Sequence, residues 1–252
     1  TADALVACGS SGVWQGVGGC PSGSVPYDGE CLPCGDAVIV DAGPLYFWPL
    51  DDGGSTAVDA TGRKNGTYNG TIGRSTSTPV YGSSGVDFSG SLSNYIRFDS
   101  FSPPQGDSTV MGWFHTSAVD AGIISYARSG EFNEWLPLYS PADLNYHVKG
   151  TGVASGVAVD DDQWHHVAMS RVESTGMVTL FVDGVERGTV TVRPGESPSG
   201  GGVMVFAQEQ DSLGGGFQSN QALIGGLDDV AMFASAFDAA AVARLYHGQI
   251  CE

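Results

Sequence analysis

Basic residues are scarce in this sequence, and their scarcity limits the partners that the protein can have. The chain of 252 residues contains 10 Lys and Arg against 28 Asp and Glu, a formal net charge of −18 at pH 7. The first basic residue is Arg63. Proteins hold phosphate backbones with clustered Lys and Arg, so no nucleic acid partner is expected, whereas cations and cationic surfaces suit this charge.

Long apolar runs are also absent. No stretch approaches the roughly 20 apolar residues that a membrane helix needs, so we expect no membrane insertion in this segment. The chain begins Thr-Ala-Asp-Ala-Leu, without an initiator Met or a basic and then apolar leader, which indicates a chain processed or excised from a longer one. Apolar residues make up 41% of the sequence, enough for one large core with a small appendage.

Cysteine is missing from the long middle of the chain and concentrated at its start. The segment 8–36 is rich in Gly, Ser and Pro, and its apolar side chains are too few to hold a shape by burial. Such a segment needs covalent or metal staples. The cysteines of the chain are Cys8, Cys20, Cys31, Cys34 and Cys251.

Disulfides and a zinc site are the two ways to staple this segment. Only one Cys-x-x-Cys pair is present, so a secreted disulfide knot, similar to the Cys-rich modules of extracellular multidomain proteins, is favoured over a four-Cys zinc site. An odd number of cysteines leaves one thiol unpaired, and Cys251 can pair back to the knot and join the two ends of the chain. We predict a Cys-rich extracellular module over residues 1–37 and a main domain over residues 38–252.

Two glycosylation sequons stand close together, Asn65-Gly-Thr and Asn69-Gly-Thr. Beside a disulfide knot they favour an extracellular or cell-surface location, with glycans at Asn65 and Asn69. Such triplets also occur by chance, so a plain Gly-rich turn is the alternative interpretation.

From residue 38 onward, short apolar or alternating runs recur between Gly, Pro, Ser and Asn. This pattern predicts an all-β sandwich of antiparallel strands, and Asp183-Gly184 between two alternating runs marks a hairpin. The expected strands are 37–40, 45–50, 86–88, 95–98, 109–116, 122–127, 135–140, 144–150, 164–172, 177–184, 185–192, 203–207 and 227–233.

One short helix is expected near the end of the chain, over residues 237–248. Asp238 can cap its first turn, and the following alanines favour helix. Val242, Leu245 and Tyr246 fall on one face, and Gly248 can end the last turn. We therefore expect this helix to lie against the sandwich.

Three stretches, 46–68, 163–188 and 222–248, together resemble the laminin-G-like jelly rolls of the concanavalin A-like superfamily. Within that superfamily, residues 203–233 are most similar to the signature region of the pentraxins, through Gln208-Glu209-Gln210-Asp211, Gly214-Gly215, Phe217 and Gln221. The resemblance covers roughly residues 45–248. It implies a two-sheet antiparallel jelly-roll sandwich that acts as an extracellular, lectin-like recognition module.

The segment from Glu209 to Asp211 has its own chemical interest. It places two carboxylates and an amide within three residues, ahead of a Gly-rich stretch that can fold back. Ca²⁺ takes six to eight oxygen ligands of these kinds. The alternative interpretation is a solvated acidic loop, which a chain this acidic often contains.

The resemblance to pentraxins implies that this loop binds paired Ca²⁺ ions. It implies carboxylate ligation by Glu209 and Asp211 and backbone-carbonyl ligation by Gln210. Gln221 matches a ligand of the second ion, and Asn133, from the loop after Ser-Tyr-Ala, matches a further ligand.

The sequence departs from the family pattern at two of these positions. Phe132 and Gln218 stand where pentraxins have acidic ligands, which leaves Gln218 a weaker candidate. Glu131 can replace the carboxylate missing at Phe132 if the loop shifts. We therefore expect one Ca²⁺ ion and a second that binds poorly or not at all.

The core differs from the family pattern as well. Pentraxins tie two core strands with a disulfide, but neither matching strand of this chain contains Cys. We expect packing to hold the sandwich instead, with Trp113, Trp164 and Phe181 in its core.

Other polar and aromatic residues have both a functional and a plainer interpretation. His165 and His166 look like a metal or catalytic pair, but strand neighbours point to opposite faces, which favours a structural role. Trp135 and Tyr139 can form an aromatic wall on which a sugar ring stacks, or they can be core residues.

Two acidic groups remain open in the same way. Asp228 and Asp229 can help to bind a metal ion, although a position beside a core strand is favoured. A second group can carry a separate Ca²⁺ of the laminin-G-like type, although an acidic surface turn is favoured; it comprises Asp51, Asp52, Asp59 and Asn65.

The favoured function is Ca²⁺-dependent binding of a carbohydrate or of an anionic phosphate or carboxylate ligand. The alternative is a structural or assembly module that binds neighbouring modules of a large extracellular or cell-surface protein, with Ca²⁺ only stiffening a loop. An enzyme is not expected, because the sequence has no Glu-x-Asp-x-Glu stretch and no nucleophile elbow in a strand-to-helix context.

Overall fold

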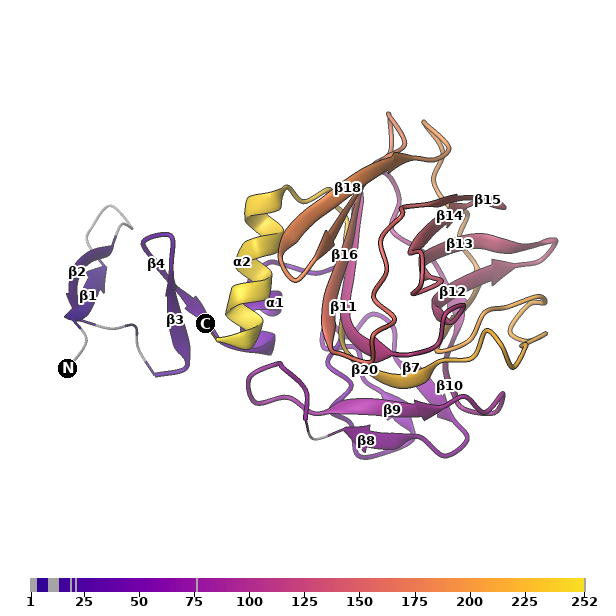
Figure 1. Cartoon of the computed structure of the whole chain (residues 1–252), viewed down its shortest axis with the longest axis horizontal. Helices are drawn as coiled ribbons and strands as arrows, with labels where there is room; N and C mark the ends of the chain where they lie inside the picture. The colour runs from indigo at the N-terminus through magenta and orange to yellow at the C-terminus, as the bar shows by residue number, and fades with distance from the viewer. Residues whose placement is uncertain (1–3, 9–13, 19, 21, 76, 252) are drawn as a thin grey trace.

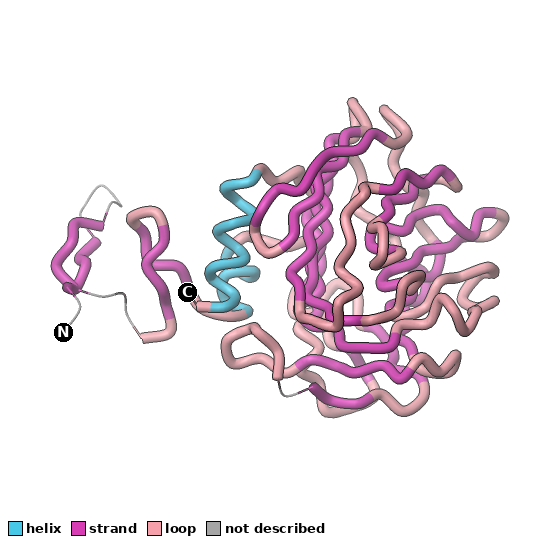
Figure 2. Tube along the Cα trace, in the orientation of Figure 1, coloured by secondary structure: helices cyan, strands magenta, loops and turns pink. Residues whose placement is uncertain are grey.

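The computed structural model describes residues 4–8, 14–18, 20, 22–75 and 77–251, and two antiparallel sheets packed face to face make up most of it (Figure 1; Figure 2). Strands account for 45% of residues and helices for 8%, which confirms the all-β sandwich prediction.

The first sheet contains, in spatial order, β15 (Thr151–Ala154), β14 (Asn145–Val148), β13 (Glu131–Tyr139), β12 (Gly122–Arg128), β19 (Gly202–Phe206), β10 (Tyr95–Phe101), β7 (Gly66–Asn69) and β6 (Thr56–Ala57). The second sheet contains β18 (Val185–Thr191), β17 (Met177–Val182), β16 (His165–Val172), β11 (Ser108–Thr116), β20 (Ile224–Phe233), β9 (Gly85–Ser89) and β8 (Gly73–Ser75), and β5 (Tyr46–Trp48) also pairs with β20.

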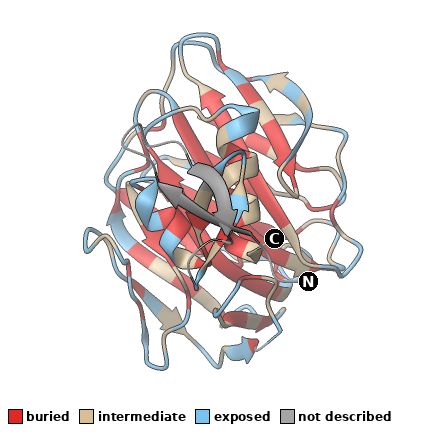
Figure 3. Cartoon of the chain, turned by 90° about the vertical axis from the view of Figure 1, so that its left-hand side faces the viewer, coloured by how far each residue is buried: buried red, intermediate tan, exposed pale blue. Residues whose placement is uncertain are grey.

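Apolar and aromatic side chains fill the space between the sheets. In β10, Ile96 and Phe98 are fully buried whereas Arg97 between them is not, as strand alternation requires. The ring centroids of Trp48 and Phe206 lie 4.8 and 4.7 Å from that of Phe98. Buried residues follow the strands through the middle of the molecule, and exposed residues gather at the loops (Figure 3).

Two of the three predicted core residues are in the core. Trp113 and Phe181 are buried. Trp164 is only half-buried, with its ring 4.6 Å from that of His115, so its assignment to the core is wrong. It lies just before the first residue of β16, at the rim of the sheet, where its ring covers a neighbour rather than the space between the sheets.

Strand β20 changes its partner on one side. Up to Leu227 it pairs with β9, and from Val230 it pairs with β5. Between these pairings lie Asp228 and Asp229, at the point where the register with β11 also shifts. Asp229 has a φ of 48°, the left-handed conformation found in some β-bulges.

A short helix, α1 (Asp36–Asp41), occupies the stretch that we predict to be the strand 37–40, so that prediction is wrong. The described part of the chain therefore has two helices rather than one. A run of four apolar residues suits a buried helical turn as well as a strand. Here Val38 and Ile39 are buried on the side of α1 that meets the C-terminal helix.

The C-terminal helix, α2 (Ala239–Ile250), begins as predicted, because Oδ1 of Asp238 accepts a hydrogen bond from the backbone N of Ala241 at 2.9 Å. It ends at Cys251 and not at Gly248, so the predicted stop is wrong. Gly248 serves packing instead, since a Cβ there would lie 2.7 Å from Cγ2 of Val38.

Helix α2 lies over the outer face of the second sheet (Figure 1). Its Val242 and Leu245 pack against side chains of β11, β16, β17 and β20, as the amphipathic pattern predicts. Neither helix of the described chain is long and apolar enough to cross a membrane.

Two hairpins precede the helices, β1 (Ala4–Cys8) with β2 (Trp14–Gly18) and β3 (Ser24–Tyr27) with β4 (Glu30–Pro33). The boundary that we predict after residue 37 falls inside α1. Sequence patterns also missed β6, β7, β8 and β15, strands of two to four residues with little apolar content.

Disulfides join Cys20 to Cys31 and Cys34 to Cys251. The preference for disulfides over zinc is therefore confirmed for these four cysteines, and Cys251 does pair back to the N-terminal segment. Cys8 is the remaining cysteine, and its side chain lies outside the described residues.

Candidate functional site

The loop between β19 and β20 is fixed from beneath by one buried side chain. Gln210 is fully buried, and its Nε2 donates hydrogen bonds to the backbone oxygens of Ser125 and Val203 at 3.1 and 3.2 Å. Its Oε1 accepts from the backbone N of Gly214 at 2.9 Å. The side chain of Gln210 is thus fully engaged, and only its backbone carbonyl is left for the ligand role that the pentraxin resemblance implies.

A small cavity of about 110 Å³ lies beside this loop. Strands β13 and β14 form one side of it, and the β19–β20 loop forms the other. The structure thereby brings together four of the predicted metal ligands and one predicted aromatic residue. The lining residues are Asn133, Leu136, Tyr139, His147, Glu209, Asp211 and Gln221.

Four side-chain oxygens at this cavity are buried and accept no hydrogen bond: both carboxylate oxygens of Glu209, Oδ1 of Asn133 and Oε1 of Gln221. An unsatisfied buried acceptor costs about 1–3 kcal/mol, and a charged one costs more. Burial, with Asp211 and Asp120 nearby, raises the pKa of Glu209 to about 7. A bound cation would satisfy these oxygens together and favour the ionised form of Glu209.

The oxygen donors at this cavity are carboxylates and amides together. Across the described residues, no three or more His, Cys, Asp and Glu side chains are gathered in a group that could hold a metal ion. An ion here would therefore depend on the amide oxygens of Asn133 and Gln221 as well as on Glu209 and Asp211. Such a mixed oxygen set suits Ca²⁺.

The weaker candidates lie at the rim or outside the cavity. Asp211 is exposed, and its Oδ2 accepts a hydrogen bond from Nε2 of Gln218. Oε1 of Glu131 accepts from the backbone N of Asn133 at 3.2 Å, and Glu131 does not line the cavity. In this conformation neither Gln218 nor Glu131 offers an oxygen to the buried group.

Sequence reasoning missed two polar residues here. His147 has a buried Nδ1 without a partner, and burial lowers its pKa, so the ring is neutral near pH 7. One sequence signal could have identified His147: burial alternates along β14, and because Tyr146 and Val148 are buried, His147 lies on the opposite face. Asp120, from the β11–β12 loop, gave no such signal. Burial and a hydrogen bond with Asp120 raise the pKa of Tyr139.

The two aromatic candidates have different roles. Trp135 is buried in the core, and its Nε1 donates to the hydroxyl of Tyr146 at 2.9 Å. The proposal of Trp135 as part of a ligand wall is therefore wrong, because the ring has no accessible face. Tyr139 does line the cavity, and its hydroxyl accepts from Nε2 of Gln221 at 3.1 Å.

The adjacent histidines lie in separate environments, as strand alternation predicts. Nδ1 of His165 lies 2.8 Å from Oδ2 of Asp183, and this hydrogen bond raises the pKa of His165. His166 is fully buried with its ring 5.4 Å from that of Trp113, and burial lowers its pKa to about 4. The two rings have different surroundings, which supports the structural interpretation.

The acidic loop 51–65 does not assemble a metal site. Asp59 is 2% exposed, and its carboxylate is taken up by backbone N–H donors at 2.7–3.1 Å. Oδ1 of Asn65 accepts from the backbone N of Asp59 at 2.9 Å, and Oδ2 of Asp52 accepts from that of Val58 at the same distance. The donors to Asp59 are the backbone N–H groups of Phe47, Thr61, Arg63 and Lys64.

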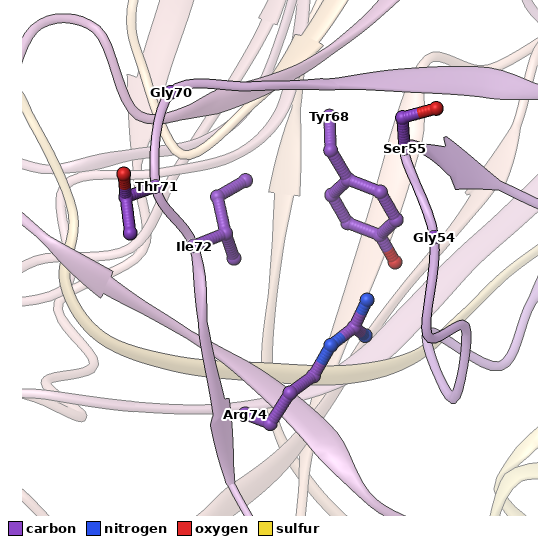
Figure 4. Close-up of a pocket in the computed structure, with 7 residues that line it drawn as sticks. All are labelled: Gly54, Ser55, Tyr68, Gly70, Thr71, Ile72 and Arg74. Atoms are coloured by element: carbon purple, nitrogen blue, oxygen red, sulfur yellow. The ribbon is translucent and has the colours of Figure 1, made fainter.

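The sequon asparagines flank β7. Asn65 is exposed and Asn69 is half-buried, and their glycosylation stays a prediction. Beside them opens a wider cavity of about 390 Å³, where the side chains of Tyr68 and Arg74 point toward one another (Figure 4). The Arg74 guanidinium carbon lies 5.0 Å from the centre of the Tyr68 ring. No carboxylate lines this cavity, so it does not offer the ligands of a hard cation.

The sandwich shares its fold with several solved structures. A SAP-like pentraxin from Limulus polyphemus is similar with a TM-score of 0.51 and 24% identity, over 68% of this chain and 79% of that chain. The receptor binding domain of a botulinum neurotoxin C/D mosaic serotype is similar with a TM-score of 0.62 and 14% identity, over 83% and 52%. These likenesses concern the fold.

Sequence comparison identifies the family. The sequence model of the Pentaxin family matches residues 92–252, so the chain belongs to the pentraxins. Neuronal pentraxin-2 of Homo sapiens is 33% identical over 126 residues, and C-reactive protein of Rattus norvegicus is 29% identical over 129 residues. Adhesion G protein-coupled receptor D2 of Homo sapiens is 40% identical over 92 residues.

These matches cover only part of each protein. They span 47%, 51% and 36% of this chain, and 28%, 56% and 9% of the respective relatives. Pentraxin proteins are generally binding proteins rather than enzymes, and membership of this family supports a lectin-like recognition module.

Proposed function

We propose that this domain binds Ca²⁺ beside Glu209 and uses the ion to recognise a carbohydrate or an anionic ligand outside the cell. The observation that carries the proposal is the group of four buried, unpartnered oxygens from Glu209, Asn133 and Gln221. Membership of the pentraxin family supports a recognition role, and the disulfides support an extracellular or cell-surface location.

Each residue has a distinct part in this proposal. Glu209, Asn133 and Gln221 would hold the ion from the buried side, and Asp211 would hold it at the exposed rim. A bound Ca²⁺ with free coordination positions accepts oxygens of vicinal hydroxyls, phosphate or carboxylate groups. We propose a single ion at this cavity, because Phe132 is apolar and Gln218 is already paired with Asp211.

Calcium titration followed by calorimetry tests the ion site. The wild-type protein is expected to bind Ca²⁺ and to melt at a higher temperature in its presence. Glu209→Gln keeps the shape of the side chain but removes its charge, so the ion bound at this cavity should be lost from the titration or its affinity weakened at least ~10-fold. Glu186→Gln is the matched control, since Glu186 is exposed on β18 in the other sheet. Unchanged binding by Glu209→Gln would reject the site.

Retention on ligand resins tests the recognition step. One resin carries a phosphate monoester and another carries galactose, and each is run with Ca²⁺ and with a chelator. The proposal predicts retention on at least one resin with Ca²⁺, release by the chelator, and no retention of Glu209→Gln. Retention that ignores the chelator would contradict a role for the ion in recognition.

A structural or assembly module is the second candidate function. Two observations favour it. The hydrogen bond between Gln218 and Asp211 reduces the number of ligands available to an ion, and the Cys34–Cys251 disulfide fixes the β3–β4 hairpin to the sandwich. Under this alternative, Ca²⁺ raises the melting temperature without retention on either resin, and the partners are neighbouring extracellular modules.

A further inference from the structure

The point at which β20 changes its partner is where four segments that are far apart in the sequence meet. The loop before β9 reaches the end of α2, where the backbone N of Tyr81 donates to the oxygen of Gln249 at 2.8 Å. The start of α1 reaches the same turn, where the backbone N of Gly35 donates to the oxygen of Gly248 at 2.9 Å. The point at which β20 changes partner, with Asp228 and Asp229, completes the meeting point.

Four carboxyl groups form a cluster at this point, between the surface and the interior. Asp51 is exposed, Asp36 is half-buried, and Asp228 and Asp229 are fully buried. Oγ of Ser83 joins the outer and inner groups, since it lies 3.2 Å from Oδ1 of Asp51 and 3.3 Å from Oδ1 of Asp228. The cluster therefore has a polar route to solvent through Asp51 and Ser83.

The buried end of the cluster has more acceptors than donors, and the hydroxyls of Ser83 and Thr78 are the donors to Asp228. Nε2 of Gln249 donates to Oδ2 of Asp229 at 2.8 Å. Oδ2 of Asp228, Oδ1 of Asp229 and Oε1 of Gln249 are buried and have no hydrogen-bond partner, and all three residues are fully buried. Two adjacent carboxylates and an amide oxygen thus lie in the interior with their remaining lone pairs unused.

No positive charge compensates these groups. Burial, then Asp51, raises the pKa of Asp228 to about 7. Burial, then Asp228 and Asp36, raises the pKa of Asp229 well above its usual range, and burial with Asp51 raises that of Asp36. The main influences on these three groups include no basic side chain. This arrangement is unfavourable for an ionised cluster unless a cation joins it.

We propose that this cluster is a second Ca²⁺ site, held by Asp228, Asp229 and Gln249, with Asp36, Asp51 and Ser83 toward solvent. Hard oxygen donors without nitrogen or sulfur select Ca²⁺ or Mg²⁺, and the several-oxygen set with two amide or hydroxyl members suits the larger ion. Across the described residues no three carboxylates stand gathered around one point, so the ion combines the two buried carboxylates with neutral oxygens.

This site is separate from the cavity beside Glu209, which we call the recognition pocket, and it has a different role. It lies at the second sheet, where its donors come from β20, the end of α2 and the start of α1, whereas the recognition pocket lies between strands of the first sheet and the β19–β20 loop. An ion here joins the end of the Cys-rich segment to the sandwich without a covalent bond. The proposal does not depend on Ca²⁺ binding at Glu209.

The test removes calcium binding at the recognition pocket and measures whether the protein still binds calcium. In the Glu209→Gln/Asp211→Asn background, titration with CaCl₂ at pH 8 should still show one bound ion and a calcium-dependent rise in melting temperature. Adding Asp228→Asn/Asp229→Asn should weaken this binding at least ~10-fold. Asp41→Asn is the matched control, because it removes a charge from the exposed end of α1 and should leave the affinity within about twofold.

Each other outcome overturns the proposal. A folded Glu209→Gln/Asp211→Asn protein that binds no calcium removes the second site, while the proposed function stands or falls on the resin experiment. If Asp41→Asn and Asp228→Asn/Asp229→Asn lower the calcium affinity equally, the effect comes from the net charge of the protein and not from a site at Asp228 and Asp229. If the cluster takes up protons between pH 8 and 5 but binds no calcium, its carboxyl groups share protons and do not form a metal site. If the quadruple variant is unfolded, the near-isosteric Asp228→Asn alone gives the same reading.

Discussion

At the scale of single residues, two buried carboxylates show why sequence alone does not locate a site. Asp59 and Glu209 are 2% and 4% exposed, and both lie in acidic, Gly-rich loops. Asp59 accepts hydrogen bonds from four backbone N–H groups, whereas Glu209 accepts none. The loop sequence predicts that a carboxylate is present, but the donors around it come from the folded backbone.

Asp59 should therefore be a stability residue. Asp59→Ala leaves four backbone N–H groups of a tight loop without an acceptor, and we expect it to lower the free energy of unfolding by about 3 kcal/mol. Asp52→Ala is the comparison, since Asp52 accepts from one backbone N–H, and about 1 kcal/mol is expected. Urea denaturation measures both. Similar small losses in the two variants would show that the Asp59 loop is held by other contacts.

His166 should make stability depend on pH. Its folded pKa of about 4 lies below the usual value of 6.5, so the unfolded chain takes up the proton first as the pH falls. Its contribution is present above pH 6.5 and is lost between pH 6.5 and 4, on the order of 3 kcal/mol. His166→Leu should flatten the pH dependence of the unfolding free energy over this range.

His165 provides an internal comparison of opposite sign. Asp183 raises its folded pKa, so its contribution is present below the unfolded pKa and is lost as the pH rises through the folded pKa. His165→Gln should remove the gain in stability on acidification down to about pH 6.5 and leave the loss between pH 6.5 and 4 as in the wild-type protein. Parallel pH profiles for the wild type and both variants would contradict the two assignments.

At the scale of elements, sequence patterns predict what local periodicity determines. Long strands such as β11 and β16 are buried along nearly their whole length and read as apolar runs, and the capped helix α2 is apolar on one face, so all three were predicted. The element α1 was mistaken for a strand because its helical form depends on packing against α2, far along the chain. The pocket was predicted only in part. Asp120 and His147 were missed, because tertiary folding brings them to the pocket and the local sequence pattern does not determine this.

The contact between α1 and α2 gives a prediction at this scale. Alanine is usually a better helix former than glycine by up to ~1 kcal/mol, yet Gly248→Ala would place a Cβ 2.7 Å from Cγ2 of Val38. We expect it to destabilise the protein by about 1–2 kcal/mol. Val38→Ala in the same chain should recover part of that loss, which a double-mutant cycle in urea measures.

Ala240→Gly separates helix propensity from packing in this experiment. Ala240 is exposed on the same helix, so the change reports the intrinsic cost of glycine there, about 0.5–1 kcal/mol. A stabilising Gly248→Ala would show that the two helices can move apart at little cost.

At the scale of the whole molecule, the net charge of −18 is not itself the mechanism. Most acidic side chains are solvated, cap backbone groups or pair with a neighbour, as Asp59 and Asp183 do. The groups that can bind a cation are those that folding buries without donors, at Glu209 and at Asp228 and Asp229. These groups lie at different sheets, so the proposed cation sites would follow from the fold and not from composition.

The Cys34–Cys251 disulfide should contribute most to the stability of the whole molecule. It links residues separated by 217 positions, so it restricts the unfolded chain across the entire sandwich. The loop-entropy estimate for such a crosslink is about 5.4 kcal/mol, and Cys34→Ser/Cys251→Ser should lower the urea midpoint accordingly. The Cys20–Cys31 bond spans 11 positions within the N-terminal segment, so Cys20→Ser/Cys31→Ser should barely change the unfolding of the sandwich, followed by Trp fluorescence. Equal shifts of the urea midpoint in the two variants would mean that the Cys34–Cys251 disulfide acts only on the ends of the chain and does not stabilise the fold as a whole.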